Sequence, residues 1–176
     1  PWVWIVGGLL FTTFGVNLTL FGLWGIPYVV QVYDTSVTTA SVLTLIGGVG
    51  GVVGPPATGW LSDRLERRTE FVVAGALAYT VAFGTLAAVG DPPLAVVAVA
   101  FFLIGVLLGT FVLTFPIIKD RHPSAGSGIA LGTINGLGFL GAATLPTAMG
   151  RALDAYWTVA SVDGVRVYSL FGYRVA

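Results

Sequence analysis

Five long apolar stretches, none of which contains Asp, Glu, His, Lys or Arg, constrain most strongly what this chain can fold into. A helix of about 20 apolar residues crosses ~30 Å of hydrocarbon, and a charge at the bilayer centre costs at least ~2.5 kcal/mol. We therefore predict five transmembrane helices, with every charged residue between or after them. They cover about residues 2–30, 37–61, 71–90, 93–118 and 124–150.

The composition indicates a multi-pass membrane protein and excludes several functions. Only 9% of the residues are charged, against about 25% in an average soluble domain. The net charge of zero gives no support for nucleic-acid binding. The absence of cysteine excludes thiolate metal sites, and a single histidine, His122, excludes a multi-histidine site. We expect no metal and no cofactor.

The distribution of basic residues predicts the orientation. By the positive-inside rule, basic loops are cytoplasmic, so the chain start is expected in the cytoplasm of a plasma membrane. Seven arginines against one lysine suggest a GC-rich genome, and we expect a prokaryotic source. The basic residues of the second and fourth loops are Arg64, Arg67, Arg68, Lys119 and Arg121, whereas the first and third loops hold only Asp34 and Asp91.

The chain is predicted to divide into three parts. Residues 1–150 form a five-helix transmembrane bundle. Residues 151–170 form an extracytoplasmic loop, in which two β-branched runs around Asp163-Gly164 suggest a β-hairpin; an irregular loop is an equally good interpretation. Residues 171–176 are predicted to begin a further transmembrane helix that is truncated in this chain.

The loop after the second stretch carries a recognisable motif. Its sequence, Gly59-Trp60-Leu61-Ser62-Asp63-Arg64-Leu65-Glu66-Arg67-Arg68, resembles the signature loop of the major facilitator superfamily, G-x-L-x-D-R-x-G-R-R/K. Glu66 departs from the family's glycine, which puts the tight turn in question. Residues 119–154, which end in a G-x-x-L-D pattern, are similar to the connection before the eleventh helix and that helix itself.

This resemblance implies an all-α integral membrane fold, in which the chain forms helices seven to eleven and the start of helix twelve of a twelve-helix bundle. It also implies a secondary active transporter, a symporter or antiporter among the possibilities, that moves a small solute by alternating access. The implied partners are the solute, a possible coupling ion, membrane lipid and the N-terminal half of the same transporter.

The motif residues are predicted to form a cytoplasmic gate. Gly59 lets a neighbouring backbone approach, and Asp63 can accept hydrogen bonds from another helix N-terminus, where a negative charge is favoured. The arginines are expected to bind lipid phosphates or to pair with Asp63. The predicted gating residues are Gly59, Asp63, Arg64, Arg67 and Arg68.

Glycines and prolines inside the stretches predict how the helices pack and bend. Small residues four apart allow two helices to approach backbone to backbone. We expect a kink at Pro27, and a bend or break of the second helix at Gly54-Pro55-Pro56. The predicted packing glycines are Gly47, Gly51 and Gly54 on the second stretch, and Gly128, Gly132 and Gly136, in line with Ser124, on the fifth.

Polar residues within the stretches are candidates for a solute pathway, because lipid offers them no hydrogen-bond partner. The resemblance implies that the seventh, tenth and eleventh helices line a central cavity. The alternative is an ordinary interhelical hydrogen bond, worth about 0.6 kcal/mol. The candidates are Thr13, Asn17, Trp24 and Tyr28 on one face of the first stretch, Thr110 and Thr114 on the fourth, and Asn135 on the fifth.

No nucleophile–base pair and no phosphate-binding loop can be found in the sequence, so we do not expect an enzyme. The competing hypothesis is a membrane scaffold or an intramembrane enzyme subunit. A scaffold needs no hydrated cavity, and an enzyme needs reactive groups at membrane depth.

Overall fold

The computed structural model describes the chain except residues 1, 90, 122–125, 159–160, 163–164 and 176, and the side chains of residues 162 and 165. His122, Ser124 and the predicted turn at Asp163-Gly164 lie outside the described residues.

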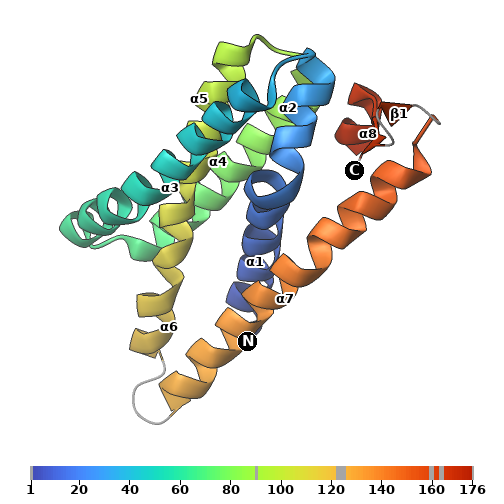
Figure 1. Cartoon of the computed structure of the whole chain (residues 1–176). Coiled ribbons are helices and arrows are strands. Elements are labelled where there is room, and N and C mark those ends of the chain that lie inside the picture. The colour runs from blue at the N-terminus through green and yellow to red at the C-terminus, as the bar shows by residue number, and fades with distance from the viewer. Residues whose placement is uncertain (1, 90, 122–125, 159–160, 163–164, 176) are drawn as a thin grey trace.

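Helices make up almost all of the described chain (Figure 1). A π-helix, η1, joins the first two α-helices without a break, and α5 and α6 are separated only by Leu113. In chain order the elements are α1 (Trp2–Asn17), η1 (Leu18–Trp24), α2 (Gly25–Tyr33), α3 (Val37–Leu65), α4 (Arg68–Val89), α5 (Leu94–Val112), α6 (Thr114–Arg121), α7 (Gly126–Ala155), β1 (Ser161–Val162), β2 (Val165–Arg166) and α8 (Leu170–Val175).

Five helical segments are long and apolar enough to cross a membrane, which confirms the predicted all-α membrane class. Their apolar side chains cover much of the surface: Val52 is 75% exposed and Ile129 is 76% exposed. Such faces suit lipid, because acyl chains are as apolar as the side chains of a protein core. The five segments are Trp2–Tyr33, Val37–Leu65, Arg68–Val89, Leu94–Arg121 and Gly126–Ala155.

The bundle has two chemically different ends. The start of α1, the α3–α4 turn and the end of α6 lie at one of them, which we call the arginine end (Figure 1). The other, the hairpin end, carries β1, β2 and α8, together with the α2–α3 and α4–α5 connections.

Prolines distort the helices less than the sequence suggests. The irregular part of the first segment is η1, which ends just before Pro27; the amide of Gly25 donates to the carbonyl of Leu20, five residues back. A π turn of this kind accommodates a local distortion without ending the helix. The helix α3 runs through both Pro55 and Pro56. We predicted that the helix bends or breaks at this point, and the predicted break is wrong.

Glycines let two helix pairs approach closely, and α3 packs most extensively against α5. A Cβ atom on Gly105 of α5 would overlap the carbonyl oxygen of Gly47, and one on Gly109 would overlap the backbone of Gly54. A Cβ on Gly54 would in turn overlap the carbonyl of Val106. Two predicted packing glycines, Gly47 and Gly54, therefore do lie at a tight interface.

The second tight pair is α1 with α7, and its close contacts involve glycines of α7 other than the predicted ones. A Cβ on Gly141 would overlap the carbonyl of Phe11, and one on Gly138 would lie 2.8 Å from the Phe14 ring. No atom of the described chain comes within 4 Å of a Cβ built on Gly128, Gly132 or Gly136. Their stripe lies on the face of α7 that α1 does not cover. Gly51 makes only ordinary contact, with Leu108 at 3.8 Å.

A polar clasp holds the segment after α7 against the bundle. The strands β1 and β2 pair antiparallel. Arg166, in β2, pairs with Asp154 at 2.5 Å, and the Tyr168 hydroxyl donates to the same carboxylate oxygen at 2.7 Å. The Tyr168 amide donates to Oε1 of Gln31 on α2 at 3.0 Å. These contacts place α8 beside the hairpin-end portions of α2, α4 and α7.

Candidate functional site

The turn between α3 and α4 is built around a left-handed residue. Glu66 adopts φ 54° and ψ 32°, and the Arg67 amide donates to the carbonyl of Ser62 at 3.2 Å. Helices commonly end in this way, usually with glycine. The tight turn that Glu66 put in question therefore forms, with a side chain held in a conformation that costs roughly 1–2 kcal/mol.

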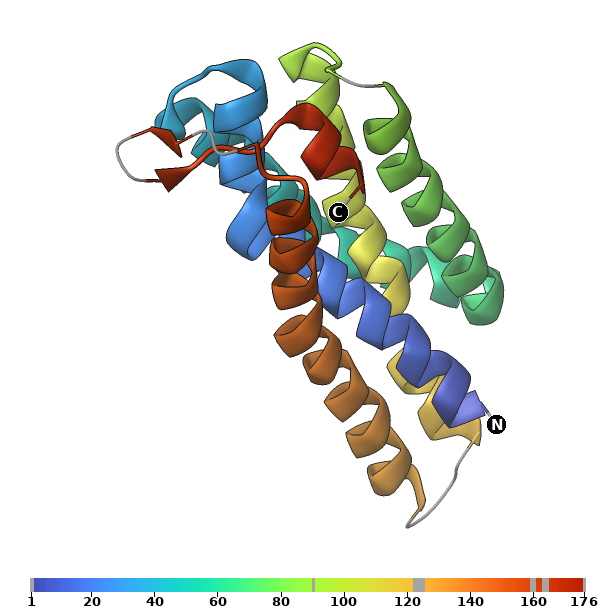
Figure 2. The same cartoon turned by 90° about the vertical axis from the view of Figure 1, so that its right-hand side faces the viewer.

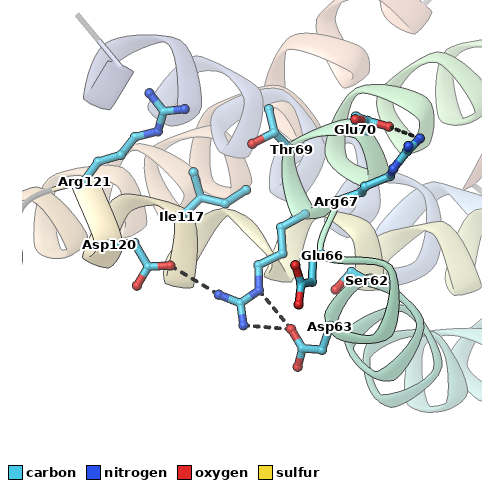
Figure 3. A pocket seen from close by; sticks show the side chains of 10 residues that line it. Ser62, Asp63, Glu66, Arg67, Thr69, Glu70, Ile117, Asp120 and Arg121 are labelled. Atoms are coloured by element: carbon cyan, nitrogen blue, oxygen red, sulfur yellow. Dashed lines mark hydrogen bonds and ion pairs between the residues drawn. The ribbon is translucent and has the colours of Figure 1, made fainter.

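Arg68, the first residue of α4, is bracketed by two carboxylates from different helices (Figure 3). Its Nε and Nη2 donate to Oδ1 of Asp63 at 2.9 and 2.7 Å. Its Nη1 donates to Oδ2 of Asp120, near the end of α6, at 3.2 Å. We call Asp63, Arg68 and Asp120 the ionic bridge. The hydrogen bonds to Asp63 and the charge of that carboxylate raise the pKa of the Arg68 guanidinium, so Arg68 stays charged at any working pH.

A cavity of about 660 Å³ surrounds the ionic bridge at the arginine end. Beside it, Arg67 pairs with Glu70 of its own helix at 3.2 Å. Arg121, at the end of α6, stacks over Trp2 with 4.1 Å between the guanidinium carbon and the ring centre. The cavity walls thus carry both signs of charge.

The predicted gating residues have different partners in the structure. Asp63 is paired with Arg68, as expected, and not with the other two arginines: Arg64 stacks over Trp60 at 5.4 Å. No described atom lies within 4 Å of a Cβ built on Gly59, so the expected close approach does not occur within this chain. Asp120 was missed, although its place beside Lys119 in the second basic loop is a signal that could have found it.

A second cavity, of about 980 Å³, lies between α1, η1, α4 and α7 and reaches α8. We call it the lateral groove. Three of the predicted pathway residues line it: Thr13, Trp24 and Tyr28. Asn17 lies behind its wall and donates a hydrogen bond to the hydroxyl oxygen of Tyr79, which does line it.

The remaining pathway candidates do not reach the groove. Thr110 is 4% exposed and Thr114 is 1% exposed, and each hydroxyl donates to a carbonyl three residues back. Both are packing residues; a Cβ on Gly75 of α4 would overlap Thr110. Asn135 is half-buried on the same uncovered side of α7 as Gly132 and Gly136.

The clasp joins titratable groups at the hairpin end, Asp154, Arg166 and Tyr168, which shift one another's pKa values. Burial raises the pKa of the Tyr168 hydroxyl, and the hydrogen bond to the Asp154 carboxylate raises it further. The same carboxylate raises the pKa of Arg166. Both shifts favour the protonated donors, so the clasp stays closed across the neutral range and weakens only where Asp154 becomes protonated or Tyr168 ionises.

Comparison with known proteins agrees with this architecture. The family model described as Major Facilitator Superfamily matches residues 1–162. A Mycobacterium tuberculosis protein named "Probable nitrate/nitrite transporter NarK2" is 30% identical over 155 residues, 88% of this chain and 38% of that protein. A gentisate transporter of Corynebacterium glutamicum is 30% identical over 153 residues, 85% of this chain and 34% of that protein. No solved structure gives a significant match.

The chain thus spans between a third and two fifths of the length of these curated relatives. The family model covers nearly all of it, and these relatives are transporters by name. The chain belongs to the Major Facilitator Superfamily.

Proposed function

We propose that this chain is part of a secondary active transporter that moves a small solute by alternating access, and that the ionic bridge is its latch at the cytoplasmic face. The observation that carries this proposal is that Arg68 joins Asp63, at the end of α3, to Asp120, at the end of α6. The Arg68 side chain thereby connects the α3–α4 turn to the end of α6. A movement that separates α6 from the α3–α4 turn must break a charged contact.

The exposure of the bridge supports a latch of modest strength. The side chains of Arg68, Asp63 and Asp120 are 38%, 60% and 66% exposed. Exposed ion pairs contribute little free energy and are screened by salt. A contact of this kind biases two conformations without locking either, which is what a transporter that must cycle requires.

The orientation belongs to the same proposal. The basic residues of the α3–α4 turn and of the end of α6 lie at the arginine end, whereas the α2–α3 and α4–α5 connections at the other end carry the acidic Asp34 and Asp91. The positive-inside rule then assigns the arginine end, and with it the chain start, to the cytoplasm.

One side of α7 has no neighbour within the described chain, which leaves room for another part of the transporter to pack there. Gly128, Gly132 and Gly136 have space for a neighbour that this chain does not supply. We infer that this side faces the N-terminal half and the solute pathway, and that Asn135 is the polar group that the described chain offers there. The names of the relatives make nitrate, nitrite and gentisate the solutes to assay first.

The latch is tested with Asp63→Asn in the full-length transporter, reconstituted in vesicles. We expect a changed transport rate and a changed ratio of inward- to outward-facing molecules, measured by labelling cysteines at each face. Glu70→Gln, which alters only the neighbouring Arg67 pair, is the matched control. If Asp63→Asn leaves both the rate and the accessibility unaltered, the latch assignment is wrong.

A further inference from the structure

The side chain of Gln31, near the end of α2, hydrogen-bonds to the segment that follows α7 in the way that a β-strand would. Its Nε2 donates to the carbonyl of Arg166 at 3.2 Å, and the amide of Tyr168 donates to its Oε1 at 3.0 Å. These two backbone groups flank Val167, and a neighbouring parallel strand would bond the same pair. The Tyr173 hydroxyl of α8 also donates to Oε1, at 2.9 Å, which uses the second lone pair of that oxygen.

The segment that Gln31 holds is also fastened to the end of α7. Arg166 and the Tyr168 hydroxyl both bond Oδ1 of Asp154. Arg166 and Tyr168 therefore each contact Asp154 through the side chain and Gln31 through the backbone. Two residues of the clasp thus join α2 to α7.

The clasp connects two helix ends that are otherwise apart. The backbones of α2 and α7 do not approach each other closely within the described chain, and the two helices diverge toward the hairpin end (Figure 1). Nearer the middle of the bundle, α7 meets the first segment at η1, where Nε1 of Trp24 donates to the carbonyl of Pro146 at 3.4 Å. Figure 2 shows the strands β1 and β2 beside α2 at the hairpin end, where Gln31 holds them.

The clasp is better shielded from solvent than the ionic bridge. Tyr168 is 8% exposed, and its ring packs edge-on against Trp24 with 5.9 Å between the ring centres. Tyr28 packs in the same way against Tyr173, at 5.4 Å. Opening the clasp would expose these rings and exchange the bonds of Gln31 for bonds to water, whereas the ionic bridge opens by separating side chains that are already exposed. The clasp is therefore the contact that costs more to break.

We propose that Gln31 fastens α2 to α7 throughout the transport cycle, so that the hairpin-end portions of these two helices move as one body. The inference rests on the proposed transport function and adds which contact stays closed. Gln31 is a positioning residue, which acts through Arg166 and Tyr168. Solute access at the hairpin end then arises between this body and other parts of the transporter, and not from a separation of α2 from α7.

The first experiment links the clasp covalently in the full-length transporter, reconstituted in vesicles. Gln31→Cys and Val167→Cys are joined by a short bifunctional thiol reagent that a reductant cleaves, and the 176-residue chain has no cysteine of its own to interfere. A link that fits both conformations equally favours neither. We therefore expect uptake of nitrate, nitrite or gentisate to be at least as fast with the link as after its cleavage. Uptake that the link slows and cleavage restores overturns the proposal.

A second linked pair separates this proposal from that of the latch. Thr69→Cys on α4 and Ile117→Cys on α6, which both line the cavity around the ionic bridge, are joined by the same reagent. This link should stop uptake until it is cleaved, because α6 must separate from the α3–α4 turn. Uptake that persists with this link refutes the latch, whereas uptake blocked by the link between positions 31 and 167 refutes the fastening of α2 to α7.

The second experiment needs no transported solute. Nitroxide labels at Val32 on α2 and Arg151 on α7 report the distance between the two helices by pulsed electron paramagnetic resonance. We expect one distance with the clasp intact, and a second, longer one after Gln31→Leu, which removes all three bonds. Gln31→Glu keeps the length of the side chain but places an acceptor against the Arg166 carbonyl, so it should add the longer distance too. Two distances with the clasp intact, or an unchanged distribution in either variant, overturn the proposal.

Discussion

The side-chain amide of Asn17, in the middle of the first segment, donates a hydrogen bond to the hydroxyl oxygen of Tyr79 on α4. The same amide also donates to the carbonyl of Thr13 at 3.2 Å. The contact crosses between helices 62 residues apart in the sequence. Asn17 therefore has an interhelical partner, which is the alternative to a solute contact that the sequence left open.

Removing the Tyr79 hydroxyl should weaken the packing of α1 against α4. We expect Tyr79→Phe to lower the free energy of unfolding by about 0.6 kcal/mol, and by no more than about 1.7 kcal/mol, the range measured for such bonds in membranes. Unfolding in mixed detergent measures it, with Thr80→Val as the control because the Thr80 hydroxyl bonds only its own helix. In a double-mutant cycle with Asn17→Leu, strictly additive effects would show that the bond contributes nothing.

The accessibility of the two intramembrane asparagines should differ. In the full-length transporter we expect Asn135→Cys to react with a small water-soluble thiol reagent, because Asn135 lies on the uncovered side of α7. Asn17→Cys should react less, because the Asn17 side chain contacts Tyr79 of α4 and its amide oxygen is buried. Equal protection at both positions would favour a scaffold without a hydrated pathway over a transporter.

Glycine substitutions should separate tight interfaces from open ones. Gly105→Ala and Gly141→Ala place a methyl group against the backbone of Gly47 and Phe11 respectively. We expect each to lower stability by about 1–3 kcal/mol, the usual effect of overpacking. Gly132→Ala meets no described atom within 4 Å and should leave the stability of this part of the chain unchanged or slightly higher. Thermal unfolding in detergent compares the three, and similar losses for all of them would refute the packing description.

Replacing Glu66 by glycine should stabilise the α3–α4 turn. The residue has φ 54°, which glycine adopts without a Cβ penalty. We expect Glu66→Gly to raise the free energy of unfolding by up to about 1 kcal/mol. Glu66→Ala removes the same charge but keeps the Cβ atom, so it should give no such gain. A stabilisation that is equal in both variants would indicate a charge effect instead of relieved backbone strain.

The two carboxylates of the ionic bridge should contribute unequally. Arg68 donates twice to Asp63 and once, at 3.2 Å, to Asp120. We expect Asp63→Asn to shift the inward/outward ratio by no more than about fivefold, in keeping with an exposed pair. Asp120→Asn should shift it less. Both shifts should shrink at 1 M salt, where the Debye length falls to about 3 Å. An effect insensitive to salt would mean that the residues act through packing.

The sequence was sufficient for the fold class, because spans without charges leave few alternatives to membrane helices. It also located the α3–α4 turn and the pairing of Asp63 with an arginine. It could not tell which side of a helix meets which neighbour: Gly132 and Gly141 look equivalent in the sequence, yet only Gly141 meets α1. Asp120 and Tyr79 escaped notice because their partners lie 52 and 62 residues away, beyond the reach of local periodicity.

The prolines within α3 restrict where that helix can lie in the bilayer. Pro55 and Pro56 have no amide hydrogen, so the carbonyls of Gly51 and Val52 lose the donors that a regular helix would provide. Hydrocarbon cannot replace those donors. Any rotation of α3 that turned these oxygens toward acyl chains would therefore be opposed, and we expect the transport cycle to move α3 as a rigid unit that keeps them near water or protein.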